Sequence, residues 1–125
     1  MTNLLVVLLV SIFWTTLAAA DVSGVWSLDL DPDFSAHRGS GECTFRQADK
    51  ELTGHCGTDS PNPTPLRGEV DEHKIVFQFK TGKTNEITAV FVAELDDHAR
   101  TMKGTWAIGD AQGQKGRGTF QAKKR

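Results

Sequence analysis

The sequence predicts an all-β fold, an eight-stranded antiparallel up-and-down β-barrel with one disulfide. Apolar and polar residues alternate with a period of two in eight short segments separated by turn residues. Neighbouring segments also match apolar to apolar residues when they are folded as hairpins. Closing such a sheet removes its two exposed edges, so a barrel is favoured over the alternative, a two-sheet sandwich.

The first twenty residues differ in character from the rest of the chain. Residues 4–17 are apolar apart from three hydroxyl side chains, and Ala18-Ala19-Ala20 forms a small-x-small site before Asp21. This pattern predicts a signal peptide, residues 1–20, rather than an uncleaved membrane anchor, because the apolar run is short and broken by threonine. We therefore expect a secreted or periplasmic protein with no membrane span after cleavage and one barrel domain, residues 21–125.

The first predicted strand, 23–30, alternates Trp26 and Leu28 with outward residues. The next two, 41–48 and 51–57, form a hairpin about Asp49-Lys50. This register places Cys56 opposite Cys43 at a non-hydrogen-bonded site, where side chains come closest. A Cys43–Cys56 disulfide is expected in an oxidising compartment. A metal pair or two free thiols is the alternative, but neither cysteine has a further His or Cys at ligand spacing.

Five predicted strands remain after the first hairpin, and four of them form two further hairpins. Strands 65–71 and 74–80 turn at Glu72-His73, which places Leu66 opposite Phe79. Strands 86–95 and 99–108 turn at Asp97-His98. That register sets four pairs of inward residues opposite each other, namely Ala93 with Met102, Phe91 with Gly104, Ala89 with Trp106 and Ile87 with Ile108.

The last strand, 117–124, carries Gly118, Phe120 and Ala122 on its inner face and ends in a basic run, Lys123-Lys124-Arg125. The first strand opens with Gly24-Val25-Trp26, and Gly-x-Trp recurs in Gly104-Thr105-Trp106. These features resemble the calycin barrels, the lipocalin and avidin-like families. The resemblance implies that Trp26 is a structural plug at one barrel end and that Arg125 or Lys124 packs across it. It also implies a small exported lipocalin-like barrel that binds a ligand.

Binding is expected where the longer connections gather, because loops on a rigid scaffold usually carry function. In a meander, the connections 31–41, 57–65, 81–85 and 109–116 share one end, whereas the tight turns and both mature termini share the other. We expect a small, mainly apolar ligand at this long-loop mouth. The candidate ligand-binding residues are Phe34, His37, Arg38, Phe79, Ala89 and Trp106.

Several other functions lack support in the sequence. The formal net charge of −2 argues against nucleic-acid binding. The chain has no nucleophile elbow, phosphate loop or zinc motif, so we expect neither an enzyme nor a cofactor. Asp29, Asp31 and Asp33 have calcium-loop spacing, but Phe34 occupies the glycine position, and we expect no metal site.

The alternative function is a protein-binding barrel with a filled interior. Val76, Val90 and Val92 fall on the outer face of adjacent strands and form a candidate protein contact. Small exported barrels with one disulfide also resemble the periplasmic inhibitors of bacterial metalloproteases, which insert an N-terminal arm into the protease. Only three mature residues precede Gly24 here, so an inhibitor-like or envelope interaction module would have to bind through its loops or outer face.

Overall fold

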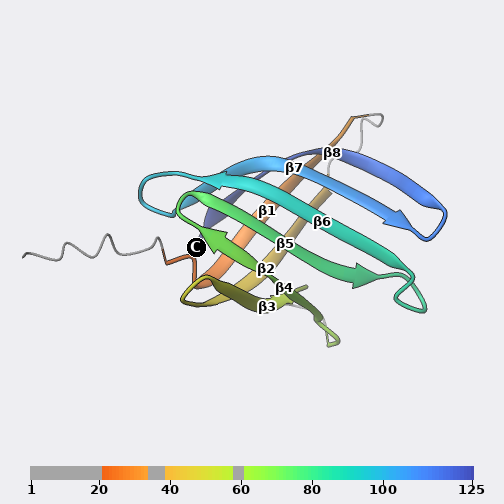
Figure 1. The fold of residues 1–125 in the computed structure, drawn as a ribbon, viewed down its shortest axis with the longest axis horizontal. Helices are drawn as coiled ribbons and strands as arrows, with labels where there is room; N and C mark the ends of the chain where they lie inside the picture. The colour runs from red at the N-terminus through yellow and green to blue at the C-terminus, as the bar shows by residue number, and fades with distance from the viewer. Residues whose placement is uncertain (1–20, 34–38, 58–60) are drawn as a thin grey trace, which may run out of the picture.

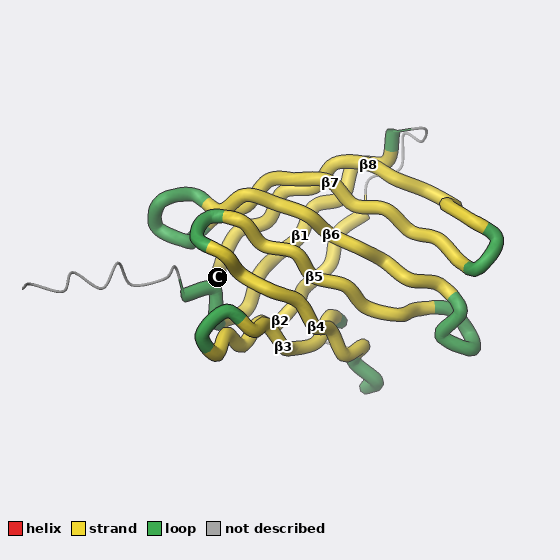
Figure 2. The backbone as a smooth tube through the Cα atoms, in the orientation of Figure 1, coloured by secondary structure: helices red, strands yellow, loops and turns green. Residues whose placement is uncertain are grey.

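The computed structural model describes residues 21–33, 39–57 and 61–125, and over this part the chain consists of strands and loops (Figures 1 and 2). The prediction of an all-β fold is therefore confirmed. The eight strands are β1 (Gly24–Pro32), β2 (Gly39–Ala48), β3 (Glu51–Cys56), β4 (Thr64–Asp71), β5 (Lys74–Thr81), β6 (Ile87–Leu95), β7 (Thr101–Asp110) and β8 (Gly113–Lys124). No helix in these residues has the length and apolar character needed to cross a membrane.

The strands close into a single antiparallel barrel in which each pairs with the next along the chain and β8 returns to β1. Closure leaves the sheet without long free edges, as the meander predicts. The register of the first hairpin is confirmed, because Cys43 lies opposite Cys56 and the two form a disulfide with a Cα–Cα distance of 3.9 Å. The second hairpin is also confirmed, with Leu66 opposite Phe79.

The predicted register of the third hairpin is wrong by two residues. Ala93 pairs with Gly104, Phe91 with Trp106 and Ala89 with Ile108. The cause is the turn, because β6 ends at Leu95 and β7 begins at Thr101, which leaves five residues between them instead of two. The Asp96 carboxylate accepts hydrogen bonds from the backbone N–H groups of Arg100 (2.7 Å) and Thr101 (3.0 Å), which stabilises the wider turn. A shift of two residues preserves the inner face, so the predicted core survives the error.

The connection between β7 and β8 is also shorter than expected. Residues 109–116 were expected to form a long loop, but the two strands pair as far as Asp110 opposite Gly113 and leave a two-residue turn. A register shift between Ile108 and Gly109 leaves Lys115 without a partner on β7, which is a β-bulge. This hairpin therefore lines the mouth as paired strands rather than as a loop.

The barrel interior combines large aromatic side chains with glycines. Phe45 faces Gly54, Phe77 faces Gly68, Trp106 faces Gly118 and Phe120 faces Gly104 across neighbouring strands. At Gly54 a Cβ atom would collide with the backbone carbonyl oxygen of Thr44, and φ is +151°, so only glycine fits this close approach. The glycines thus let the wall bend tightly around the aromatic core.

Candidate functional site

The two ends of the barrel differ in their connections (Figure 1). The hairpin turns after β2, β4 and β6 lie at the same end as residues 21–23 and the C-terminus, and we call this the closed end. The connections after β1, β3, β5 and β7 lie at the opposite end, the mouth. Three candidate ligand residues, Phe34, His37 and Arg38, belong to the β1–β2 connection and lie outside the described residues.

Four half-buried side chains form the apolar rim of the mouth, which we call the mouth ring. They come from the four strands that run toward this end, and all pack against the buried core. Phe79 and Ile108 flank Ala89 through the strand registers, so the small Ala89 side chain, only 2% exposed, lies between two larger neighbours. The ring consists of Leu30, Cys56, Phe79 and Ile108.

Trp106 lies one register row further inside the barrel, opposite Phe91, and is 8% exposed. Its indole N–H donates a hydrogen bond to the backbone carbonyl of Thr119 at 3.0 Å, and its ring lies against Gly118. The hydrogen bond orients the indole because a buried N–H needs an acceptor. The structure therefore brings three of the predicted ligand residues, Phe79, Ala89 and Trp106, to neighbouring inward positions.

An aromatic column connects the mouth to the closed end. Phe79 stacks on Phe91 (ring centroids 5.6 Å apart), and Phe91 stacks on Phe77 at 4.7 Å with ring planes 2° apart. Phe77 meets the edge of Phe45 at 5.0 Å, and Phe45 contacts Trp26 at 6.1 Å. These separations are those of favourable aromatic pairs. The column fills the middle of the barrel, so any ligand space at the mouth has an aromatic floor.

The closed end is sealed around Trp26, which is fully buried. Its indole N–H donates to the Val22 carbonyl at 2.8 Å, and the Val22 N–H donates to Oε1 of Gln47 at 3.0 Å. Val22 is itself fully buried, so residues 21–23 are held against the barrel before β1 begins. Val22 lies in phase with Trp26 and Leu28, but it precedes the predicted strand, 23–30, so it was not included among the inward residues.

Of the two basic residues expected to pack across Trp26, Lys124 and not Arg125 lies beside it. The Arg125 guanidinium pairs with Glu42 at 2.7 Å on the outer side of the wall. Lys124 is the register partner of Trp26, and its ammonium group donates to the Asp21 carbonyl at 3.3 Å. The inward alternation of Phe120 and Ala122 continues to Lys124, which explains why Lys124 and not Arg125 has this position.

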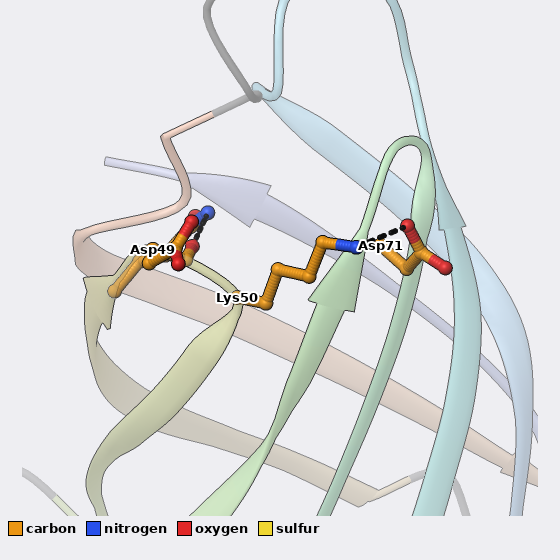
Figure 3. Close-up of polar contacts among 4 residues, drawn as sticks. Asp49, Lys50 and Asp71 are labelled. Atoms are coloured by element: carbon orange, nitrogen blue, oxygen red, sulfur yellow. Dashed lines mark hydrogen bonds and ion pairs between the residues drawn. The ribbon is translucent and has the colours of Figure 1, made fainter.

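Charged side chains on the surface at both ends make ion pairs or hydrogen bonds with nearby groups. At the closed end, Lys50 reaches from the β2–β3 turn to Asp71 at 3.6 Å (Figure 3). Hydrogen bonds from the backbone N–H groups of Thr101 and Arg100 lower the pKa of Asp96 below its ordinary 3.8. At the mouth, hydrogen bonding to its own backbone N–H, then to the Thr84 hydroxyl and N–H, lowers the pKa of Glu86 below 4.5.

Within residues 21–33, 39–57 and 61–125, the buried side chains of the interior are apolar. No polar or charged side chain in these segments is buried, and no three His, Cys, Asp or Glu residues there gather as metal ligands. The outward valines are confirmed as surface residues, with Val76 38% and Val92 37% exposed, whereas Val90 is half-buried.

Comparisons with known proteins support the fold. No family model matches the chain, and no curated protein matches it. Among solved structures, the chain is similar to that of EF1p2_mFAP2b bound to DFHBI, with a TM-score of 0.58 and 13% sequence identity. The match covers 83% of this chain and 94% of that one. At this identity the likeness extends to the barrel fold alone.

Proposed function

We propose that this chain is an exported barrel that binds a small, mainly apolar ligand at its mouth. The observation that carries the proposal is the difference in burial between the two ends. The inward apolar residues of the closed end are buried, whereas the mouth ring of Leu30, Cys56, Phe79 and Ile108 is only half-buried above an aromatic floor. Covering this ring with an apolar molecule would remove its surface from water, which is the main source of affinity in such sites.

The chemistry of the site favours an apolar ligand. A ligand held inside would meet aromatic and aliphatic carbon, since the described interior offers no buried polar side chain. Polar groups at the rim, including Glu86, Asn62 and the Arg117–Asp33 ion pair of 3.5 Å, would orient its polar end. The barrel of EF1p2_mFAP2b, with a similar fold, is bound to a small molecule, DFHBI. A calycin-type role as carrier or scavenger fits these features.

Export is supported by the leader pattern of residues 1–20 and by the Cys43–Cys56 disulfide, which persists in oxidising compartments. We do not expect the barrel to be an enzyme, because the sequence has no nucleophile elbow, phosphate loop or zinc motif. A filled barrel that binds protein is the second candidate, favoured by the aromatic column that occupies the central interior.

Binding is tested with N-phenyl-1-naphthylamine, an apolar dye whose emission rises in a dry site. We expect saturable binding of one dye per chain. Ala89→Phe places a large ring between Phe79 and Ile108, and we expect it to abolish binding while the β-sheet circular dichroism spectrum is retained. Thr88→Phe adds the same ring on the outer face of β6 and serves as the matched control, with binding unchanged.

Two results would contradict the proposal. One is dye binding that Ala89→Phe leaves intact or that Thr88→Phe reduces equally, because either would put the dye elsewhere. The other is a wild-type chain that takes up no dye and, purified from its own source, shows no bound small molecule in native mass spectrometry. A stoichiometric protein partner in the same spectrum would favour the protein-binding barrel.

A further inference from the structure

The outer face of β5 and β6 carries an apolar pair. Val76 on β5 and Val92 on β6 are direct register partners, and both side chains point away from the core. Within the described residues, they are the exposed large hydrophobic side chains of the molecule. β5 and β6 run side by side along the barrel in Figure 1. Val76 is the third residue of β5, so this pair lies toward the closed end and away from the mouth.

A row of charges crosses the same strands on the closed-end side of the valines. Through successive registers, Asp71 on β4 lies beside Lys74 on β5, Lys74 beside Glu94 on β6, and Glu94 beside Lys103 on β7. All four side chains belong to exposed residues. The order of charges is therefore minus, plus, minus, plus, and it reverses sign about the line midway between β5 and β6. The same line runs between Val76 and Val92.

We propose that this face binds a second copy of the chain about a two-fold axis that runs parallel to the strands, midway between β5 and β6. Such an axis places β5 of one copy over β6 of the other. Val76 then lies over Val92 of the partner subunit, and Lys74 lies over Glu94 of the partner subunit. In the outer positions of the row, Asp71 lies over Lys103 of the partner subunit.

Charge complementarity selects this axis among the alternatives. A two-fold axis centred on β6 would place Lys74 over Lys103 of the partner subunit, and like charges at an interface are strongly unfavourable. In the part of the chain that the structure describes, Lys74, Glu94 and Lys103 take part in none of the ion pairs, so they are available to a partner. Asp71 already pairs with Lys50 at 3.6 Å, so the contact of Lys74 with Glu94 carries most of the complementarity. Next along the strands, Gln78 and Val90 are register partners. The same axis places Gln78 over Val90 of the partner subunit, so no charges meet there.

The dimer is expected to be weak. Two convex barrels touch along a narrow strip, and such contacts fall below the roughly 1,200 Å² of total buried surface typical of stable complexes. The mouth stays open in this arrangement, because the contact lies on the side of the barrel. Self-association is therefore independent of the proposed ligand binding, and either can fail without the other.

A complementary charge swap tests the axis by sedimentation equilibrium up to about 500 µM chain. We expect the wild type to show a reversible monomer–dimer equilibrium. In a homodimer of Lys74→Glu, the new glutamate lies over Glu94 of the partner subunit in both symmetry-related contacts. In a homodimer of Glu94→Lys, the new lysine lies over Lys74 of the partner subunit in the same way. Each single variant should associate at least about tenfold more weakly than the wild type.

An equimolar mixture of the two variants should restore dimerisation, because each contact then joins a glutamate to a lysine. Lys123→Glu on the exposed face of β8 makes the same change of charge outside the interface and should leave dimerisation unchanged. Thermal unfolding of each variant checks that the barrel is intact. A wild type that stays monomeric at the highest concentration, or a mixture that stays monomeric while the wild type dimerises, would overturn the proposal.

Discussion

The closed end and the mouth are built from the same strands, yet they differ in how completely they are covered. At the closed end, Val22 lies over Trp26, and the Trp26 indole N–H donates a hydrogen bond to the Val22 carbonyl. At the mouth, the mouth-ring residues of β1, β3, β5 and β7 are only half-buried. A few residues outside the strands thus decide whether the inward side chains at an end of the barrel are fully or only partly buried.

The largest expected loss of stability follows from removing the side chain that fills the closed end. Trp26→Ala removes a fully buried indole and its bond to Val22, and we expect a loss of about 3–5 kcal/mol in the free energy of unfolding. Phe79→Ala, at the mouth, removes a half-buried ring and should cost about 1–2 kcal/mol. Urea unfolding of both variants measures the comparison. Equal losses would mean that the two ends are packed alike.

The disulfide gives the next largest effect. It joins β2 to β3 across 13 residues of chain, which corresponds to about 3 kcal/mol of loop entropy in the unfolded state. The double variant Cys43→Ala, Cys56→Ala should lose about this much in urea unfolding, and the wild type treated with a reductant provides the matched comparison. Cys43 is buried and Cys56 belongs to the mouth ring. A loss of stability near zero would mean that strand pairing in the barrel already fixes this hairpin without the disulfide.

The smallest effect concerns the β6–β7 turn at the closed end. The pKa of Asp96 is lowered in the folded chain by its bonds to the Thr101 and Arg100 N–H groups, so its ionised form stabilises the fold at and above its ordinary pKa of 3.8. This contribution is lost as pH falls through the lowered pKa. Asp96→Asn should therefore lower Tm slightly at pH 7 and differ progressively less from the wild type below pH 3.8. A difference that persists unchanged at low pH would assign the effect to something other than the carboxylate charge.

The sequence was sufficient for the strands and the inner face because a period of two survives most local errors. The two-residue turns at Asp49-Lys50 and Glu72-His73 were located, and their registers followed, whereas the two-residue turn after Asp110 was expected to be a longer loop. The third register failed because Ala99, at a φ of 52°, adopts the left-handed conformation that alanine rarely takes. Nothing in the alternation of apolar residues indicates that an aspartate will stabilise a five-residue turn.

The site was predictable in part. Phe79, Ala89 and Trp106 were identified from their inward positions, and alternation from Trp26 would also have indicated Leu30. The partial exposure of the mouth ring could not be predicted from the alternation of apolar residues. It depends on which end of the barrel is covered by residues outside the strands. The pairing of Arg125 with Glu42 likewise depends on the twist of two strands that are distant in the chain.

The positions of the tryptophans give the molecule two separate optical reporters. Trp14 lies in the expected leader, which leaves Trp26 at the sealed end and Trp106 near the mouth in residues 21–125. An indole shut away from water emits at shorter wavelength and resists quenching by iodide, whereas one beside an opening responds to whatever enters. Under the proposed function, ligand binding is expected to change the emission of Trp106, whereas the emission of Trp26 is expected to change only when the closed end unfolds.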